Sequence, residues 1–187
     1  MKLASWILHG RPAPPPHLIK QKTVLEHARR WHIPVLVETG TLHGDMVEAM
    51  KNHFEAIYSI EISPELAKKA QQRFAGNSKI RIIENDSAIA LKSLVPELHR
   101  PSLFWLDGHY SGGNTGKGEK VTPVFEELSS IYSSGIDHVV LIDDARLFGT
   151  DKDYPTMEEL ESHIRDLRPD ATITTANDCI RIIPGRQ

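Results

Sequence analysis

The sequence predicts an α/β fold in which a mainly parallel sheet is covered by helices on both faces. Five short apolar segments alternate with segments of helical periodicity, which is typical of parallel strands joined by helical crossovers. The apolar segments are nearly continuous, and such strands are buried on both faces. Two further segments flank residues 176–178 and predict an antiparallel hairpin at one edge of the sheet.

Length and composition describe one ordinary globular domain. The chain has 187 residues, of which 40% are hydrophobic and 25% charged, so neither disorder nor a fibrous repeat is suggested. The formal net charge is -3 and no basic block is present, so nucleic acid is not expected as a partner. The single cysteine, Cys179, cannot form a disulfide within the chain, and no segment approaches the roughly 18 apolar residues of a membrane span. We therefore expect a cytoplasmic protein without a membrane partner.

The chain is expected to begin with an arm and to continue as a single domain. Residues 1–17 are predicted to form an extended N-terminal arm, because the segment 10–17 is rich in proline, which removes backbone donors and disfavours helix. Residues 18–187 are predicted to form the domain. Its first helix is expected over 19–31, where apolar residues fall at helical spacing, and Pro34 ends that segment.

The alternation that follows predicts the other elements in chain order. Strands are expected over 35–37, 56–60, 80–83, 103–106 and 139–142. Helices are expected over 44–53, from 63 onward, and over 87–95, 124–134 and 157–167. The hairpin is expected over 171–175 and 179–183. The helix after the second strand has the clearest start, because Ser63 can cap it, Pro64 fits its first position and Glu65 adds an acid to its first turn.

The residues that follow the first two strands suggest a nucleoside site. In open α/β sheets, ligands bind at the carboxyl ends of the strands, where the strand order reverses. The first strand runs into Glu38-Thr39-Gly40-Thr41-Leu42-His43-Gly44, and Glu61 ends the second strand 21 positions after Gly40. That distance is typical of a carboxylate that binds ribose hydroxyls. The alternative is a plain strand-to-helix turn that needs two glycines.

The same loop does not suit a pyrophosphate. Leu42 and Asp45 stand where a dinucleotide site has glycines, and Glu38 and Asp45 would repel a phosphate. A nucleoside with a cationic end suits it better, because Glu38 can attract an ammonium or sulfonium group. S-adenosylmethionine has both of these charges and no phosphate.

The third strand is followed by Glu84-Asn85-Asp86-Ser87. Asp86 could accept a hydrogen bond from the amino group of an adenine, while Ser87 caps the next helix. The alternative is that either residue is only a helix cap.

Acidic residues also follow the fourth and fifth strands, as Asp107-Gly108-His109 and Asp143-Asp144. If these strands are neighbours, three carboxylates converge, and their repulsion must be offset by positive charge. Mg²⁺, Mn²⁺ or Ca²⁺ would supply it, and would lower the pKa of an acceptor hydroxyl whose proton His109 could take. The alternative is that the aspartates only end a strand and that His109 is an ordinary loop residue.

Two further segments have weaker signals. The glycine-rich segment 111–118 is not a phosphate loop, because Ser111 and Gly118 stand at key positions of that motif, so we expect a mobile lid or a substrate-contacting loop. His17, Lys20 and Lys22 could contact a substrate, but a solvated face is the simpler interpretation.

Five segments in order, VLVETGTLHGDMV, YSIEISPELAKKA, IIENDSAIAL, FWLDGHYSGG and VVLIDDARLF, resemble the class I S-adenosylmethionine-dependent methyltransferases. Over about residues 18–183 the nearest resemblance is to the small bacterial macrocin-type and cephalosporin-hydroxylase-type O-methyltransferases. It implies a Rossmann-like, doubly wound, seven-stranded sheet of order 3-2-1-4-5-7-6 whose last strand is antiparallel. The methyl-donor contacts that it implies are Glu38, Gly40, Thr41, Gly44, Glu61, Ile62, Asp86, Ser87 and Asp107.

The resemblance also implies a function, which is transfer of a methyl group from S-adenosylmethionine to a hydroxyl of a small-molecule or saccharide-like acceptor. Asp107, Asp143 and Asp144 would bind Mg²⁺, and His109 and Asp107 would be the catalytic residues. His109 is a departure, because those enzymes tend to carry Asp there. The alternatives are a metal-independent N- or O-methyltransferase and a non-catalytic regulatory or scaffold protein that binds the donor. The sequence is compatible with a homo-oligomer.

Overall fold

The computed structural model describes residues 3–108 and 122–185. The strands are β1 (Val35–Thr39), β2 (Ala56–Glu61), β3 (Ile80–Glu84), β4 (Ser102–Leu106), β5 (Val139–Ile142), β6 (Thr172–Ala176) and β7 (Cys179–Ile183). The helices are α1 (Leu3–Leu8), α2 (His17–Arg30), α3 (Asp45–Met50), α4 (Pro64–Phe74), α5 (Ser87–Leu94), α6 (Val124–Tyr132) and α7 (Met157–Leu167). Two short 3-10 turns are η1 (Val95–Glu97) and η2 (Ala145–Leu147).

The predicted α/β fold is confirmed. All seven strands form one sheet of order β3-β2-β1-β4-β5-β7-β6. The first five strands are mutually parallel, while β7 pairs antiparallel with both β5 and β6. The chain thus winds from β1 toward β3 and then restarts at β4 on the other side of β1. In open α/β sheets such a reversal, here between β1 and β4, is where ligands bind, at the carboxyl ends of the strands.

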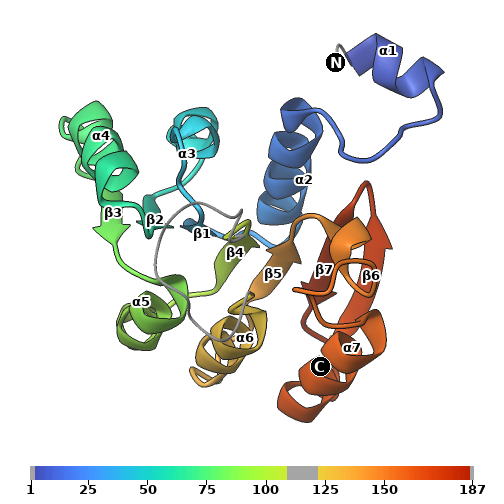
Figure 1. The fold of residues 1–187 in the computed structure, drawn as a ribbon. Helices are drawn as coiled ribbons and strands as arrows, with labels where there is room; N and C mark the ends of the chain where they lie inside the picture. The colour runs from blue at the N-terminus through green and yellow to red at the C-terminus, as the bar shows by residue number, and fades with distance from the viewer. Residues whose placement is uncertain (1–2, 109–121, 186–187) are drawn as a thin grey trace.

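Helices cover both faces of the sheet. Figure 1 shows α2, α3 and α4 on one face and α5, α6 and α7 on the other. Alternate strand residues face each layer: Leu36 packs with the first group of helices, and Val37 packs with the second. Both side chains are fully buried, as are most residues of β1, β4 and β5. The continuous apolar strands of the sequence are explained by this two-sided burial.

Most element boundaries lie within three residues of the prediction. The predicted start of α4 is confirmed, because Ser63 is its N-cap and its hydroxyl accepts a hydrogen bond from the backbone of Leu66 at 3.5 Å. Strand β1 is longer than predicted, since its ladder with β2 and β4 continues through Glu38 and Thr39. Helix α3 is shorter than predicted and ends at Met50.

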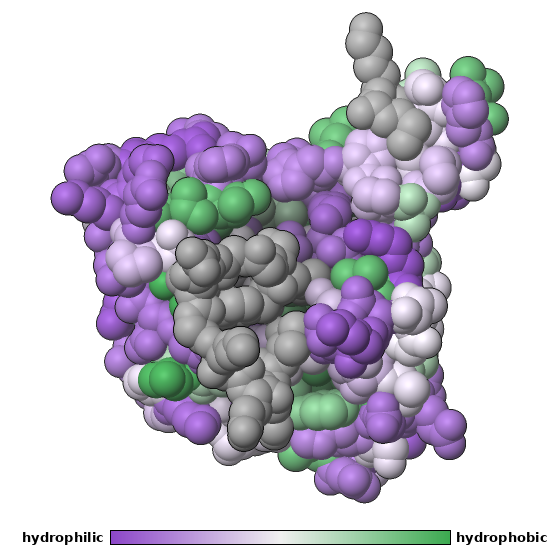
Figure 2. Space-filling model, in the orientation of Figure 1, coloured by the Kyte–Doolittle hydropathy of each residue, from purple (hydrophilic) through white to green (hydrophobic). Residues whose placement is uncertain are grey.

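The N-terminal arm differs from the extended segment that was predicted over 1–17. Residues 3–8 form helix α1, because they contain neither proline nor glycine and one side chain is anchored. Trp6 is buried, and its indole N–H donates to the backbone carbonyl of Pro12 at 2.7 Å. Figure 2 shows green, hydrophobic residues on α1, where Leu3, Ile7 and Leu8 are exposed. The division into arm and domain stays a prediction. In the described part of the chain, every helix is too short or too polar to cross a membrane.

Because the central strands are buried on both faces, we expect their packing to contribute strongly to the free energy of unfolding. Replacing the fully buried Leu36 by alanine should lower the free energy of unfolding by about 2 to 5 kcal/mol, because a cavity is left between β1 and its helices. Urea denaturation measures this change. Leu8→Ala is the control, since Leu8 is 83% exposed and its loss should cost no more than about 0.5 kcal/mol. Equal losses for the two variants would contradict this description of the core.

Candidate functional site

Two glycines let the loop after β1 approach its neighbours. Gly40 has φ +84°, and a Cβ atom on it would lie 2.6 Å from the backbone oxygen of Asp107. Gly44 has φ +76°, and a Cβ atom there would lie 2.7 Å from the ring of Phe74. Both positions therefore require glycine, for conformation as well as for space. The structure thus assigns each of these predicted donor contacts a role in shaping the loop.

Glu61 ties this loop to the start of α4. One oxygen of its carboxylate accepts from the backbone N–H of Leu42 at 2.8 Å, and the other accepts from the backbone N–H of Ser63 at 2.9 Å. The Leu42 backbone is held in the left-handed region at φ +48°. Each carboxylate oxygen can accept more than one hydrogen bond, so Glu61 retains acceptor capacity toward a ligand.

Exposed apolar side chains follow each of the first three strands. Leu42 comes after β1, Ile62 after β2, and Ile89 lies in the first turn of α5 after β3, with exposed fractions of 59%, 45% and 57%. Because these strands are adjacent and parallel, the three residues lie along the same edge of the sheet. Sequence reasoning identified only Ile62 as a ligand contact. A carboxylate beside apolar side chains is suited to a sugar hydroxyl attached to a flat, weakly polar ring.

Glu38 is a buried acid beneath the loop. Its side chain accepts a hydrogen bond from the Ser59 hydroxyl at 2.5 Å, and that hydroxyl lies 2.6 Å from the hydroxyl of Thr41. Burial, with smaller contributions from Asp107 and Glu61, raises the pKa of Glu38 to about 8. Among the described residues no cationic side chain forms an ion pair with it. In this environment the Glu38 carboxyl holds its proton at neutral pH.

The structure corrects the predicted cap of α5. Asp86, rather than Ser87, is the N-cap, because its carboxylate accepts from the backbone N–H of Ile89 at 3.2 Å. Ser87 is the first helical residue. The carboxylate that was predicted to meet an adenine therefore also caps the helix, and the adenine contact itself stays a prediction.

Three aspartates converge at the ends of β4 and β5, which are neighbours as the sequence argument required. Asp107, Asp143 and Asp144 each offer an oxygen, and these oxygens all lie within 4.8 Å of one another. Asp143 is completely buried, and its Oδ1 atom has no hydrogen-bond partner. Burial and mutual repulsion raise the pKa values of Asp107 and Asp143.

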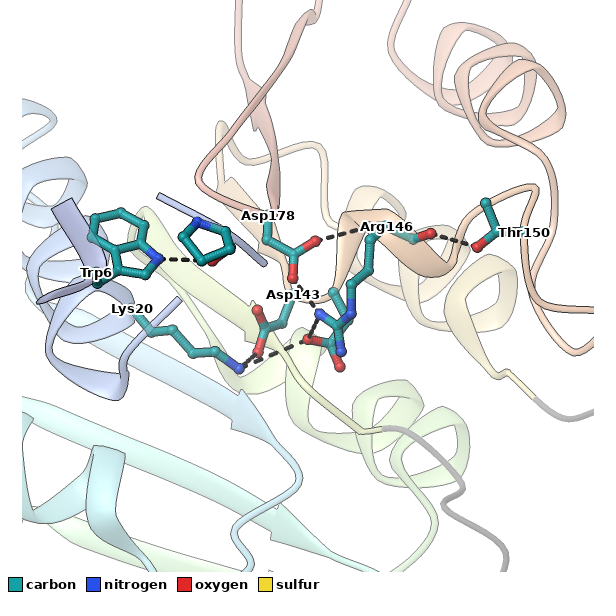
Figure 3. A network of polar contacts seen from close by, with 8 residues as sticks. Trp6, Lys20, Asp143, Arg146, Thr150 and Asp178 are labelled. Atoms are coloured by element: carbon teal, nitrogen blue, oxygen red, sulfur yellow. Dashed lines mark hydrogen bonds and ion pairs between the residues drawn. The ribbon is translucent and has the colours of Figure 1, made fainter. Parts of the chain in front are cut away.

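Two cationic side chains already lie against this acidic cluster (Figure 3). Lys20 of α2 forms an ion pair with Asp143 Oδ2, and its Nζ atom is 3.9 Å from Asp144 Oδ1. Arg146 donates to Asp144 Oδ1 at 2.7 Å and also pairs with Asp178. Burial would lower the pKa of Lys20, but the three aspartates outweigh that effect and raise it.

The arrangement of these side chains does not fit a divalent ion. Carboxylate oxygens are the right donors, but Asp143 Oδ2 is bonded to an ammonium group and Asp144 Oδ1 to a guanidinium group. An ion would have to displace both cations to use these atoms. A positive charge was predicted here in the form of a metal ion, and the described residues supply it as Lys20 and Arg146.

Sequence reasoning missed two residues of the site. Lys20 was taken for a solvated residue, because nothing in the sequence indicates that α2 reaches the end of β5. Glu127 was not considered, although helical spacing places it with Val124 and Leu128 on the apolar face of α6. Burial raises the pKa of Glu127 to about 7, and a hydrogen bond with Ser87 opposes this effect. His109 and the glycine-rich segment 111–118 lie outside the described residues.

The strand order and the single antiparallel strand define the fold of the S-adenosylmethionine-dependent methyltransferases. The O-methyltransferase of Bacillus cereus, solved with S-adenosylhomocysteine, is similar with a TM-score of 0.63, 13% identity, and coverage of 97% of this chain and 88% of that chain. TomG of Streptomyces achromogenes, an O-methyltransferase of tomaymycin synthesis solved with S-adenosylmethionine, gives a TM-score of 0.62, 17% identity, and coverage of 96% and 86%. The N-methyltransferase NodS of Bradyrhizobium japonicum gives a TM-score of 0.59, 13% identity, and coverage of 91% and 97%.

No protein-family model matches the sequence, and no curated protein does. The predicted resemblance to S-adenosylmethionine-dependent methyltransferases is thus confirmed at the level of the fold, with O-methyltransferases among the similar structures. The finer grouping with macrocin-type enzymes stays a prediction.

The buried state of Glu38 predicts a pH dependence of stability. Its pKa rises from the ordinary value of 4.5 to about 8, so the folded protein holds a proton that the unfolded chain has released between these values. This contribution to stability is complete below pH 4.5 and is lost as the pH rises through about 8. The ligand-free protein should therefore lose stability between pH 5 and pH 8, and Glu38→Gln should remove about 1 to 4 kcal/mol of that loss.

Urea denaturation at several pH values measures this effect. Glu55→Gln is the control, because Glu55 is exposed and its pKa is lowered by Arg100, so its titration falls below this pH window. An identical pH profile for wild type and Glu38→Gln would show that Glu38 is not a buried, uncompensated acid.

Proposed function

We propose that this protein is an S-adenosylmethionine-dependent methyltransferase that methylates a hydroxyl group of a small-molecule or saccharide-like acceptor. The main observation in favour of this proposal is the environment of the Glu61 carboxylate. Its carboxylate lies at the end of β2, is bonded to the loop after β1, and is adjacent in sequence to the exposed Ile62. This is the arrangement that an adenosine group needs at the reversal of strand order.

The charges around the loop favour this donor over a dinucleotide. Glu38 is buried without a cationic partner among the described residues, and Glu61 is also nearly buried. Glu61, together with Asp45 in the first turn of α3, would repel a pyrophosphate, and a protonated Glu38 would offer it no positive charge. A donor that has an ammonium group and a sulfonium group would offset the same charges.

Different residues of the chain would bind the donor and accept the proton of the acceptor. Glu61 and Asp86 would bind the nucleoside, and Glu38 would attract the cationic end of the donor. The donor supplies an activated methyl group on its sulfonium sulfur. Transfer breaks the S–C bond and forms an O–C bond, while the hydroxyl proton passes to a base. We assign that base to His109, which directly follows Asp107 and Gly108 in the sequence.

Asp107 directly follows β4. Its backbone oxygen lies against the Gly40 loop, and its carboxylate belongs to the acidic cluster. These two contacts support a role for Asp107 toward both donor and acceptor. We keep it, with His109, as a catalytic candidate.

The second candidate function is a reaction without metal, on oxygen or nitrogen. It is favoured by the ion pairs of Lys20 and Arg146, which supply positive charge where Mg²⁺ was expected. An N-methyltransferase is among the proteins of similar fold. Turnover over a panel of hydroxyl and amine acceptors separates these chemistries, and donor binding without turnover would favour a regulatory or scaffold role.

Donor binding is the first experiment. Isothermal titration with S-adenosylhomocysteine should give saturable binding to the wild type. Glu61→Gln should weaken it about 10- to 100-fold, since hydrogen bonds to a charged group are lost and the loop after β1 loses a fixed partner. Glu65→Gln is the matched control, because Glu65 is exposed in the first turn of α4 and pairs with the equally exposed Lys69 of the same helix. No binding by the wild type at millimolar ligand would reject the proposed donor.

A further inference from the structure

Lys20 has an unusual environment for a lysine. Its side chain is 17% exposed, and its ammonium group lies between Asp143 Oδ2 and Asp144 Oδ1. The third acid of the cluster, Asp107, also acts on it electrostatically. Asp143 is completely buried, so this ion pair is largely shielded from water. Shielding makes the pairing of charges matter far more than at a surface.

Lys22 shows what an ordinary lysine of the same helix does. It lies two residues further along α2, is 69% exposed, and pairs with Glu26 on the outer surface at 3.7 Å. The two lysines therefore lie on different sides of α2. Only Lys20 reaches across from α2 to the end of β5, over a sequence separation of 123 residues.

Two cationic side chains of this chain lie against the acidic cluster. Arg146 binds Asp144 and Asp178, and Lys20 binds Asp143 (Figure 3). These contacts use Asp143 Oδ2 and Asp144 Oδ1, so a hard divalent ion could bind these two atoms only by displacing the cations. An ammonium group fixed among them also repels such an ion.

We propose that Lys20 occupies the place of a divalent metal ion in the acidic cluster, so that this site works with an internal ammonium group and excludes the metal. Lys20 is then a positioning residue, which holds Asp143 and Asp144 at the ends of the strands and offsets their charge. The inference concerns the site of the proposed function, but it is tested without donor or acceptor. Its failure is therefore distinguishable from failure of the proposed methyl transfer.

The test is the binding of Mn²⁺, followed by electron paramagnetic resonance of the free ion at neutral pH. The wild type should show no saturable binding up to about 1 mM Mn²⁺. Lys20→Met removes the ammonium group and leaves three carboxylates without it, so it should bind one Mn²⁺ at least about tenfold more tightly. Lys20→Arg keeps the charge and should behave as the wild type does.

Lys22→Met is the matched control, since it removes a lysine from the same helix outside the cluster and should bind no more Mn²⁺ than the wild type. Circular dichroism verifies that each variant is folded, and Lys20→Gln, which can still donate to Asp143, replaces Lys20→Met if the latter unfolds. Saturable binding of one Mn²⁺ to the wild type at micromolar concentration would overturn the inference. It would also be overturned if the folded Lys20→Met or Lys20→Gln protein bound no Mn²⁺.

A kinetic measurement provides a second readout once an acceptor is known. Wild-type turnover should be unchanged by EDTA, whereas Lys20→Met should lose activity and regain part of it when Mg²⁺ is added. Rescue by Mg²⁺ separates a loss of charge from a general loss of structure. EDTA inhibition of the wild type would contradict the inference and leave the proposed methyl transfer standing.

Discussion

Parallel pairing of β1, β4 and β5 brings acidic residues from distant parts of the sequence to one edge of the sheet, and the rest of the site depends on how their repulsion is offset. Their strand ends are adjacent because the ladders run in register. Close packing on both faces favours that register, since a shift of one residue would exchange side chains of different size between the two layers. The sheet therefore places the charges together, and other groups must compensate them.

The negative charge of these acids is offset in different ways near β4 and β5 and near β1 and β2. Near β4 and β5 the chain provides its own cations, because Lys20 pairs with Asp143 and Arg146 pairs with Asp144. Near β1 and β2, no cationic side chain of the described residues forms an ion pair with Glu38. Leu42 and Ile62, which follow these two strands, are apolar and exposed. One side thus has cations of its own, whereas on the other side burial keeps the Glu38 carboxyl protonated at neutral pH.

The sequence allowed the sheet and its acidic edge to be predicted, because continuous apolar strands and strand-end residues are local features. Glu61 and the three aspartates were found in this way. Lys20 could not be found, because its contact depends on where α2 packs, which no local pattern encodes. Helix α1 was missed because the neighbouring prolines dominated the interpretation of residues 1–17. The buried Glu127 could have been identified from helical spacing alone.

The close approach at Gly40 has a mechanical consequence. The loop after β1 lies so near the backbone oxygen of Asp107 that not even a methyl group fits between them. The loop after β1 and the end of β4 are therefore in direct backbone contact at this point. Any displacement of the end of β4 toward this loop must therefore displace the loop after β1 as well.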